Sequence, residues 1–473
     1  MDSLIYHPTL QHLLSLSWVE LLIHLAILFT TYTLLEILYN LYLHPLRHVP
    51  GPRWAAASPA WAIYWTIYRP GQLSYELERA HLKYGPVLRI EPNRLSFSSA
   101  SAYTTIYTHR TSPQTFTKDP HLYSRLGDTD ALGFYLDHRL ARTRREFLNP
   151  DFTRRRILLS QGVVAGHVEH LVARLLEESQ NRYKDQDGER VGDGDGEEVD
   201  IYRAFRSLTL DTISRLVLGR ELGALDAPGF SHELVTGMEL VTLSIWWRFR
   251  SRVVCVLMNM LAQVVVKWAQ INLFGQVWFN RRCEEAYERT VEKVRAGVVE
   301  GGVIPRMVQE NWGKRSVVAE CADLIFAGSD TVGNALTTGF THLLRNPDAL
   351  FTLLAELKTI WPDPSSPLPA VEALEKLPYL QAVIKEFLRL SHGVTTPLFR
   401  VTAVETVVDG WRLPKGTYLG CANPVLHLDP SVYKDPHRFD PERWLNADSE
   451  ELARMGANLV AFSRGPRSCL GMQ

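Results

Sequence analysis

The sequence predicts a mainly α-helical protein with a small β-sheet region, preceded by a single membrane-spanning helix. Three observations support this fold class. A long apolar run lies near the N-terminus, short β-prone runs broken by Gly and Pro follow it, and most of the remaining chain shows the apolar spacing of amphipathic helices. With 473 residues, of which 46% are hydrophobic and 22% charged, the chain is long enough for one large domain or two mid-sized ones.

The overall charge excludes one class of partner. The 51 Lys and Arg residues against 52 Asp and Glu residues leave a net charge of -1, so no strong field attracts nucleic acid. The five cysteines are widely spaced and form no CxxC pair, which favours a reducing compartment over a disulfide-linked scaffold. They are Cys255, Cys283, Cys321, Cys421 and Cys469.

Residues 1–43 are predicted to anchor the chain in a membrane. Between Leu13 and Leu43 the only charged side chains are Glu20 and Glu36. Because about 20 apolar residues in a helix span a hydrocarbon core of about 30 Å, one transmembrane helix fits residues 19–39.

A cleaved signal peptide is the alternative interpretation of this segment. It is disfavoured because no basic region precedes the apolar run, the run is long, and no small-residue cleavage site follows it. The first basic residues, Arg47, His48 and Arg53, come directly after the run. By the positive-inside rule, the body of the protein faces the cytosol and only the amino end is lumenal.

A proline-rich hinge at residues 44–53 separates the anchor from a body domain that comprises residues 54–473. Pro45, Pro50 and Pro52 prevent the helix from continuing and stiffen the connection. The segment KYGPVLRIEPNRLSFSS then predicts a small sheet or hairpin. Amphipathic helices are predicted over residues 157–178, 201–218, 264–299, 316–345, 348–360 and 380–390.

The stretch FSRGPRSCLG near the end of the sequence holds the first candidate for chemistry. Gly465 and Gly471 flank Cys469 and leave backbone N–H groups free to hydrogen-bond to its sulfur, which stabilises a thiolate. Arg467 adds positive charge beside it. No second Cys or His stands at the spacing of a zinc site, so one axial bond to a large cofactor suits this cysteine better. An ordinary thiol in a loose loop is the alternative.

A pair of opposite charges lies in the apolar helical segment VIKEFLRL. Glu386 and Arg389 stand three residues apart on one helical face. Surface pairs of this kind contribute only roughly 0.2–0.5 kcal/mol, but the apolar neighbours on several sides indicate that this pair is buried. A buried pair needs further hydrogen-bond partners, and Arg443 of the segment PERW could supply them.

The segment LIFAGSDTVGNAL places poor helix residues inside a long apolar helix. Asp330 and Thr331 compete for backbone hydrogen bonds, and Gly328 costs about 1 kcal/mol relative to Ala. Together these residues predict a bend that makes room for a bound molecule. A Thr satisfied on its own helical turn, in an ordinary helix contact, is the alternative.

Taken in order, the segments AGSDT, EFLR, PERW and FSRGPRSCLG resemble the motifs of the cytochrome P-450 superfamily of haem-thiolate monooxygenases. The anchor and the segments HPLRHVPGP and KYGPVLRIEP extend the resemblance towards the N-terminus. Within the superfamily, DHRLARTRREFLNPDF and VIKEFLRLSHGVTTPLFR look like the fungal secondary-metabolism members typified by trichodiene oxygenase. The resemblance implies the cytochrome P-450 fold for the body domain.

The resemblance also implies a set of haem-binding residues. Cys469 would be the proximal thiolate ligand of the haem iron, and Phe462 would pack beside the loop to shield it. His138 stands where the family usually has Trp, and Arg142 follows four residues later, so both are propionate candidates. The full implied cofactor-binding set is Cys469, Arg467, Phe462, Gly465, Gly471, His138, Arg142 and Arg400.

The other two motifs receive roles from the same resemblance. Asp330 and Thr331 match the acid–alcohol pair that delivers protons to dioxygen. Gly328, with its neighbour Ala327, would leave space for dioxygen and substrate. The structural triad that holds the proximal side would be formed by Glu386, Arg389 and Arg443.

The implied cofactor is haem b, iron protoporphyrin IX. No flavin or nicotinamide fingerprint is present, so electrons must come from outside the chain. The donor that the resemblance implies is the membrane-bound NADPH–cytochrome P-450 reductase, which takes its electrons from NADPH. The implied location is the endoplasmic reticulum membrane, with a single span. The apolar segment LVTLSIWWRFRSRVVCVLMNML, residues 240–261, would roof a chamber for a hydrophobic small molecule such as a terpenoid or polyketide.

Two rival functions stay open on the sequence alone. A haem-thiolate isomerase or dehydratase works without a reductase, although such enzymes often lack the acid–alcohol pair. A truncated relic with impaired catalysis is the second rival. In the family a long helix and a final hairpin follow the cysteine loop, whereas this sequence stops at Gln473, so a body domain without its C-terminal end is expected.

Overall fold

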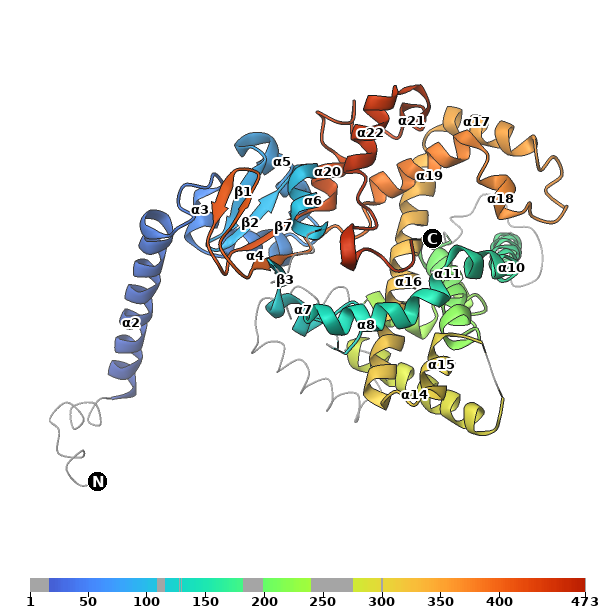
Figure 1. Ribbon diagram of the computed structural model, residues 1–473, viewed down its shortest axis with the longest axis horizontal. Helices are drawn as coiled ribbons and strands as arrows, with labels where there is room; N and C mark the ends of the chain where they lie inside the picture. Colours follow the sequence, from blue (N-terminus) through green and yellow to red (C-terminus); the bar gives the residue numbers. More distant parts are fainter. Residues whose placement is uncertain are drawn as a thin grey trace. The chain divides into compact units, whose positions relative to one another are not determined.

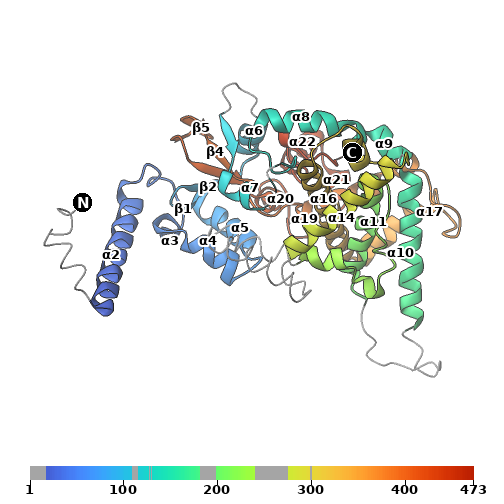
Figure 2. The same cartoon turned by 90° about the horizontal axis from the view of Figure 1, so that it is seen from below.

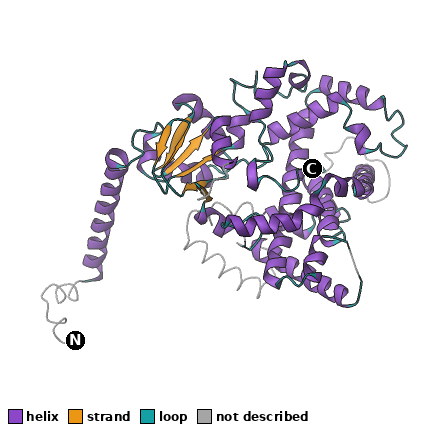
Figure 3. Ribbon diagram, viewed as in Figure 1, coloured by secondary structure: helices purple, strands orange, loops and turns teal. Residues whose placement is uncertain are grey.

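The computed structural model describes residues 17–108, 115–126, 128, 130–181, 199–239, 275–298 and 301–472. Two compact units make up the chain, residues 1–96 and residues 97–473 (Figure 1). Helices predominate in the described part and the strands are short (Figure 3), so the fold class predicted from the sequence is confirmed. The segment predicted to roof a substrate chamber, with Cys255, lies outside the described residues.

The first unit begins with an apolar helix, α2 (Trp18–Leu38). The Ser17 hydroxyl accepts a hydrogen bond from the Glu20 N–H, and the Glu20 carboxylate accepts one from the Ser17 N–H, so a capping box starts the helix. The π-helical turn η1 (Tyr39–Leu43) continues it. Trp18–Leu43 has a mean hydropathy of 1.9 and could cross a membrane by length and composition, in agreement with the helix predicted at residues 19–39.

Short helices and two strands complete the first unit. They are α3 (Arg53–Ala57), α4 (Ala60–Ile63), η2 (Tyr64–Tyr68), α5 (Leu73–Tyr84), β1 (Val87–Glu91) and β2 (Arg94–Phe97), the last of which ends at the boundary of the unit. The hinge is packed closely against β1. A Cβ on Gly51 would lie 2.5 Å from the Arg89 carbonyl oxygen, and the buried Arg89 side chain donates to the Asn40 carbonyl at 2.8 Å.

The second unit is built around the long helix α16 (Lys314–Leu344), which packs against both α11 and α19 (Figure 1). Its other described helices are α6 (Ala100–Thr108), α7 (Pro120–Leu126), α8 (His138–Leu148), η3 (Asn149–Phe152), α9 (Arg154–Leu159), α10 (Gln161–Asn181), α11 (Ile201–Leu218), η4 (Pro228–Phe230), α14 (Gly275–Arg295), α15 (Val303–Gln309), α17 (Pro347–Lys358), α18 (Val371–Leu374), α19 (Pro378–Ser391), α20 (Asn423–His427), α21 (Arg443–Asn446), α22 (Ser449–Asn458) and η5 (Gly465–Arg467).

The largest part of the core lies where α16 packs against α11, α14 and α15. Buried side chains from all four helices meet there, including Leu210, Phe279, Ile304 and Ile325. Helix α10 flanks α11 on its other side, as the view in Figure 2 shows. Burial of such apolar surface is the main force that holds α16 in place.

Helix α11 shows how local signals set the boundaries of these helices. The Asp200 carboxylate accepts hydrogen bonds from the N–H groups of Tyr202 and Arg203 at the start of the helix. At its end Gly219 adopts a left-handed conformation with a φ of +75°. The resulting helix, Ile201–Leu218, has the bounds predicted from the sequence.

The strands of the second unit form two antiparallel arrangements. Strands β7 (Tyr418–Cys421), β4 (Arg400–Thr402) and β3 (Phe116–Lys118) lie in the order β7-β4-β3, and β5 (Thr406–Val408) pairs with β6 (Trp411–Leu413). In the first arrangement Lys118 is the direct cross-strand partner of Arg400. Side chains of paired residues share one face of a sheet, so this register brings two basic side chains together.

Candidate functional site

The cysteine loop, defined here as residues 460–469, is closed by backbone hydrogen bonds. The Cys469 N–H donates to the Phe462 carbonyl at 2.8 Å, with the turn η5 between them. Gly465 has a φ of +75°, and a Cβ there would lie 2.3 Å from the Tyr107 carbonyl oxygen in α6. Only glycine fits this position, because any side chain would collide with backbone and would also strain the left-handed conformation.

Cys469 is an exposed residue. The other described cysteines, Cys283, Cys321 and Cys421, are buried. Partial burial raises the pKa of the Cys469 thiol, while a hydrogen bond from the Gly471 N–H and the charge of Arg145 lower it. Backbone N–H and guanidinium groups beside a sulfur favour its thiolate form, which is the form that binds iron.

Three basic side chains gather near the loop. Lys118 and Arg400 meet through the register of β3 and β4, and Arg467 joins them from η5. Burial lowers the pKa of Lys118 well below its ordinary value, and the charges of Arg467 and Arg400 lower it further. Burial also lowers the pKa of Arg467 to about 10, with Arg400 as the next cause. The three cations therefore repel one another in a protein interior.

Neutral carbonyl groups hold these cations in place. Arg467 Nη2 donates to the carbonyls of Tyr135 at 2.8 Å and Asp137 at 3.2 Å. Lys118 Nζ donates to the Gly133 carbonyl, and Asp323 is the carboxylate that raises its pKa. Carbonyl oxygens satisfy the donors without cancelling their charge, so the cluster is suited to an anionic ligand.

A haem group fits this set of residues. Its two propionate carboxylates would neutralise the buried Lys118 and Arg400 and the half-buried Arg467, and its iron needs an exposed cysteine such as Cys469. Sequence reasoning found Arg400 and Arg467 but missed Lys118. A single Lys in the segment TFTKDP carries no pattern that could have indicated it, since its importance comes from strand pairing.

In helix α8, the structure places the propionate candidate Arg142 away from the cysteine loop. Arg142 projects into solvent, where its Nε donates to Glu146 at 2.8 Å and its side chain is 75% exposed. The structure therefore does not bring Arg142 to the cysteine loop. Arg145 takes that position instead: its Nη1 donates to the Ser468 carbonyl at 2.6 Å and its Nη2 to the Cys469 carbonyl at 3.4 Å.

His138 begins α8 and stays near the cation cluster. It follows Asp137, whose side chain caps the helix by accepting from the Arg139 and Leu140 N–H groups and whose carbonyl accepts from Arg467. The His138 side chain is half-buried. It remains a candidate for a propionate contact on this geometry.

The AGSDT segment lies in α16, which is helical without interruption from Lys314 to Leu344. The Thr331 hydroxyl donates to the Ala327 carbonyl one turn back at 2.8 Å. Asp330 forms an ion pair with the buried Arg206 of α11, whose pKa is lowered by burial. The helix is continuous through this segment, and the Thr331 hydroxyl is satisfied on its own turn.

Gly328 has a different role from the one expected. A Cβ at this position would lie 2.5 Å from Cγ1 of Ile213, so the glycine lets α11 approach α16 closely. The expectation that Gly328 leaves space for dioxygen and substrate is therefore wrong, because the Ile213 side chain fills the space beside this glycine. Thr209 and Ser329 tie the same helices together, since the Thr209 hydroxyl donates to the Ser329 carbonyl at 2.9 Å.

Glu386 and Arg389 form the buried pair expected from the sequence. Both side chains are fully buried, and Arg389 donates from Nε at 2.7 Å and from Nη2 at 2.8 Å to the two carboxylate oxygens. Arg443 Nε lies 3.4 Å from Glu386 Oε1. The bidentate geometry gives a strong pair, and it brings together all three residues of the predicted triad.

Further donors and acceptors complete this network. Trp444 Nε1 donates to Glu386 at 2.9 Å and the Asp440 N–H donates at 3.0 Å. Arg389 in turn donates to the carbonyls of His427 and Arg438 at 3.1 and 3.0 Å. A buried ion pair is stable only with such partners, and this network ties α19 to residues 427–444.

Comparison with known proteins identifies the family. The cytochrome P450 family model matches residues 56–473, so the chain belongs to the cytochrome P450 family. A crystal structure of a cytochrome P450, CYP102L1, superposes with a TM-score of 0.65 over 84% of each chain at 19% sequence identity, which shows the same fold.

The curated relatives are monooxygenases from fungi. The chain is 30% identical over 454 residues to cytochrome P450 monooxygenase TRI4 of Trichoderma arundinaceum, covering 93% of this chain and 83% of the relative. It is 29% identical over 470 residues to sdnE of Sordaria araneosa, covering 95% and 87%, and 30% identical over 467 residues to tndB of Aspergillus flavipes, covering 92% of each. The predicted resemblance to fungal P450 monooxygenases of the trichodiene oxygenase type is thereby confirmed.

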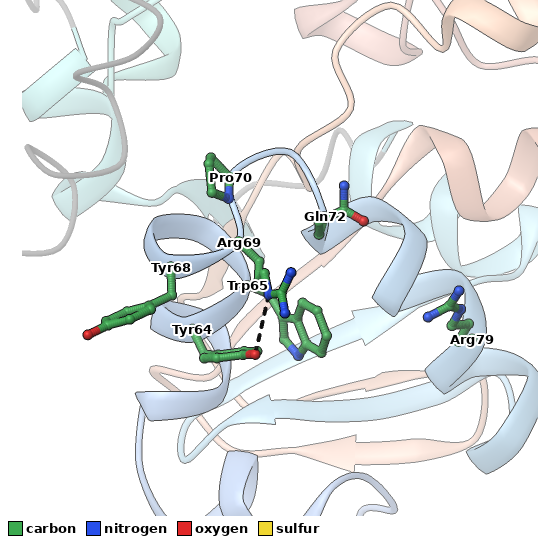
Figure 4. A pocket seen from close by; sticks show the side chains of 7 residues that line it. All are labelled: Tyr64, Trp65, Tyr68, Arg69, Pro70, Gln72 and Arg79. Carbon is green, nitrogen blue, oxygen red and sulfur yellow. Dashed lines mark hydrogen bonds between the residues drawn. The ribbon is translucent and has the colours of Figure 1, made fainter.

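A cavity of about 530 Å³ lies in the first unit and contains none of the candidate haem-binding residues. Figure 4 shows its aromatic and basic lining, with Arg69 and Trp65 from the chain around η2 and Arg79 from α5. Arg69 Nε donates to the Tyr64 hydroxyl at 3.5 Å across one side of it. Its composition is that of a surface for a polar or anionic group, not of an apolar substrate chamber.

Proposed function

We propose that this chain is a haem-thiolate monooxygenase in which Cys469 is the iron ligand and Lys118, Arg400 and Arg467 bind the propionates. The observation that supports this most is the convergence of an exposed cysteine with three mutually repelling cations, of which Lys118 and Arg400 are buried and Arg467 is half-buried. When bound, haem b supplies the oxygen-activating chemistry, for which a thiolate ligand favours cleavage of the O–O bond. The protein binds it, orients it and controls protons.

The loop residues orient the cofactor-binding sulfur. Arg145 binds the carbonyls of Ser468 and Cys469, and Gly465 allows the loop to approach α6. Burial raises the pKa of the Cys469 thiol, and the Gly471 N–H and the charge of Arg145 offset part of this rise. Both groups favour negative charge on the sulfur, and Phe462 is the residue proposed to shield it.

Asp330 and Thr331 are proposed to move protons in the reaction. The Thr331 hydroxyl proton is used in the bond to the Ala327 carbonyl, so its oxygen remains free to accept a hydrogen bond from water or substrate. Asp330 lies beside it and forms an ion pair with Arg206. A carboxylate next to a positioned hydroxyl can relay a proton from solvent.

The substrate is proposed to be a hydrophobic small molecule of fungal secondary metabolism, of the terpenoid or polyketide class. Support comes from the resemblance to fungal monooxygenases such as TRI4 and sdnE. The electrons are proposed to come from NADPH through NADPH–cytochrome P-450 reductase. An isomerase or dehydratase of the same family would instead turn over without dioxygen and reductase.

The membrane of the endoplasmic reticulum is the proposed location, with α2 as a single span and the body on the cytosolic side. The window of α2 that could span is not buried, and it is followed by Arg47 and Arg53. The cavity in Figure 4 adds an exposed Tyr68, at 79%, beside Arg69. Aromatic and basic side chains together favour the lipid headgroup region, so membrane lipid is a proposed partner.

The proposed activity is tested by reconstituting the full chain with haem, NADPH and the reductase. A monooxygenase consumes dioxygen and NADPH when a hydrophobic substrate is added, whereas an isomerase forms product when either is withheld. Loss of cofactor binding on replacement of Lys118 and Arg400 by Gln, measured as haem per protein, is expected. Full haem binding in that double variant would contradict the assigned propionate site.

A further inference from the structure

His427 is a fully buried histidine that none of the sequence motifs includes. It is the last residue of α20, and two hydrogen bonds of its ring connect α19 to the cysteine loop. Its Nε2 accepts a hydrogen bond from the Val460 N–H at 2.9 Å. Its Nδ1 lies 3.0 Å from the Arg389 carbonyl oxygen. Since Nε2 is an acceptor, the ring proton must be on Nδ1, which donates to that carbonyl.

The bond to Val460 connects His427 to Cys469 through the loop backbone. The Val460 carbonyl accepts from the Ser463 N–H at 2.9 Å, and the Phe462 carbonyl accepts from the Cys469 N–H at 2.8 Å. Val460 therefore opens the turn 460–463, and Phe462, which lies inside this turn, carries the carbonyl that closes the segment ending at Cys469. A shift of Val460 would therefore also move the carbonyl that binds the Cys469 N–H.

Two other contacts show that the loop is held from both ends. At its start Gly393 has a φ of +63°, and a Cβ there would lie 2.9 Å from the Ala461 carbonyl oxygen. At its end Arg145 binds the Ser468 and Cys469 carbonyls. His427 is the side chain that connects the start of the loop to α19, where Arg389 belongs to the buried triad.

The surroundings keep His427 in the form that this link requires. Burial lowers the pKa of its imidazole well below the ordinary value, and the neighbouring His392, with ring centroids 5.7 Å apart, lowers it further. Arg389 also faces the ring. A protonated ring would have no acceptor for the Val460 N–H, so the neutral tautomer is the one that can hold the loop.

We propose that His427 is a positioning residue that transmits the rigidity of the Glu386–Arg389–Arg443 network to the cysteine loop and so fixes the direction in which the Cys469 sulfur points. The proposal rests on the proposed function, in which that sulfur binds haem iron. The proposal predicts that the Nε2 acceptor of His427 matters more for the position of the cysteine loop than the bulk of the ring or its Nδ1 donor.

Three variants of the full chain separate these roles. His427→Gln can place an amide oxygen near the position of Nε2 and so keeps an acceptor for the Val460 N–H. His427→Asn keeps a donor near Nδ1 for the Arg389 carbonyl but is too short to reach Val460. His392→Asn is the matched control, because it alters a neighbouring, half-buried histidine whose ring makes no described hydrogen bond to the loop.

Hydrogen exchange of the peptide that contains Val460 and Ser463 is measured first by mass spectrometry. We expect exchange at least tenfold faster in His427→Asn, with His427→Gln and His392→Asn within about threefold of the wild type. Equal exchange in His427→Asn and wild type would overturn the proposal, as would equal acceleration in both His427 variants. Hydrogen exchange of peptides from α11 shows whether a variant has unfolded as a whole. If His427→Asn does unfold, the decision rests on His427→Gln. Exchange at the wild-type rate in His427→Gln supports the acceptor role, and fast exchange in that variant refutes it.

The second measurement is the Soret spectrum of the haem-loaded variants. We expect His427→Asn to convert from the thiolate-type to the thiol-type reduced, carbon-monoxide-bound spectrum at least tenfold faster than His427→Gln in dilute urea. Equal conversion rates contradict the proposal. A wild-type protein that binds haem without any thiolate-type band would contradict the proposed function, while the exchange result would still decide the role of His427.

Discussion

Replacing Glu386 by Gln tests the buried network that supports the cysteine loop. Glu386 Oε1 accepts from Arg389 Nε and Trp444 Nε1 at 2.7 and 2.9 Å, and Oε2 accepts from Arg389 Nη2 and the Asp440 N–H at 2.8 and 3.0 Å. Either orientation of a glutamine amide turns one of these oxygens into an NH2 group that faces two donors. Arg389, fully buried, also loses its counter-charge. Removal of one partner of a buried pair costs about 3–5 kcal/mol.

The assay is chemical unfolding of the full chain, followed by circular dichroism and by the haem Soret band. We expect the free energy of unfolding to fall by about 3–5 kcal/mol and haem to be lost in the same transition. Arg154→Gln is the matched control, because it breaks a bidentate pair with Glu375 that is solvent-exposed, and no measurable change is expected. A Glu386→Gln protein as stable as the control would refute the reasoning.

Three further predictions follow from the site. Thr331→Ala removes the hydroxyl bonded to Ala327, so haem content should be unchanged while peroxide released per NADPH rises severalfold; unchanged coupling would contradict its proton role. Arg145→Ala should lower haem retention, because each hydrogen bond from its charged side chain to the loop contributes about 1.5–3 kcal/mol. Arg142→Ala, at an exposed site, should leave haem retention unchanged. The reverse result would show that Arg142, and not Arg145, supports haem binding. Burial raises the pKa of Glu320 to about 8 from 4.5. Between these two values the folded chain holds a proton that the unfolded chain releases, so the free energy of unfolding falls as the pH rises from about 4.5 to about 8. Glu320→Gln should flatten this dependence in denaturant titrations at several pH values, and an unaltered slope would show that another group causes it.

The helices and the buried Glu386–Arg389 pair could be predicted because their signals are local. Amphipathic spacing, an Asp before the helix and a Gly after it define α11 within the sequence itself. Glu386 and Arg389 are three residues apart on one helical turn, so their pairing needs no tertiary information. The apolar neighbours on several sides then indicate burial, which the structure agrees with.

The contacts that depend on packing could not be predicted. Lys118 reaches the cation cluster only because β3 pairs with β4 in one register. Arg142 and Arg145 stand on the same helix, and the sequence does not say which side of α8 faces the loop. Gly328 was expected to open space, but Ile213 from another helix occupies it. In each case the deciding partner is distant in the chain.

The reduced, carbon-monoxide-bound absorption spectrum tests the central claim that Cys469 presents a thiolate to haem iron. The full chain is purified with haem and compared with Cys469→Ser, with Cys421→Ser as a control at a buried cysteine. We predict a thiolate-type Soret band in the wild type and in Cys421→Ser, and its complete loss in Cys469→Ser. A thiolate-type band that persists in Cys469→Ser would contradict the account.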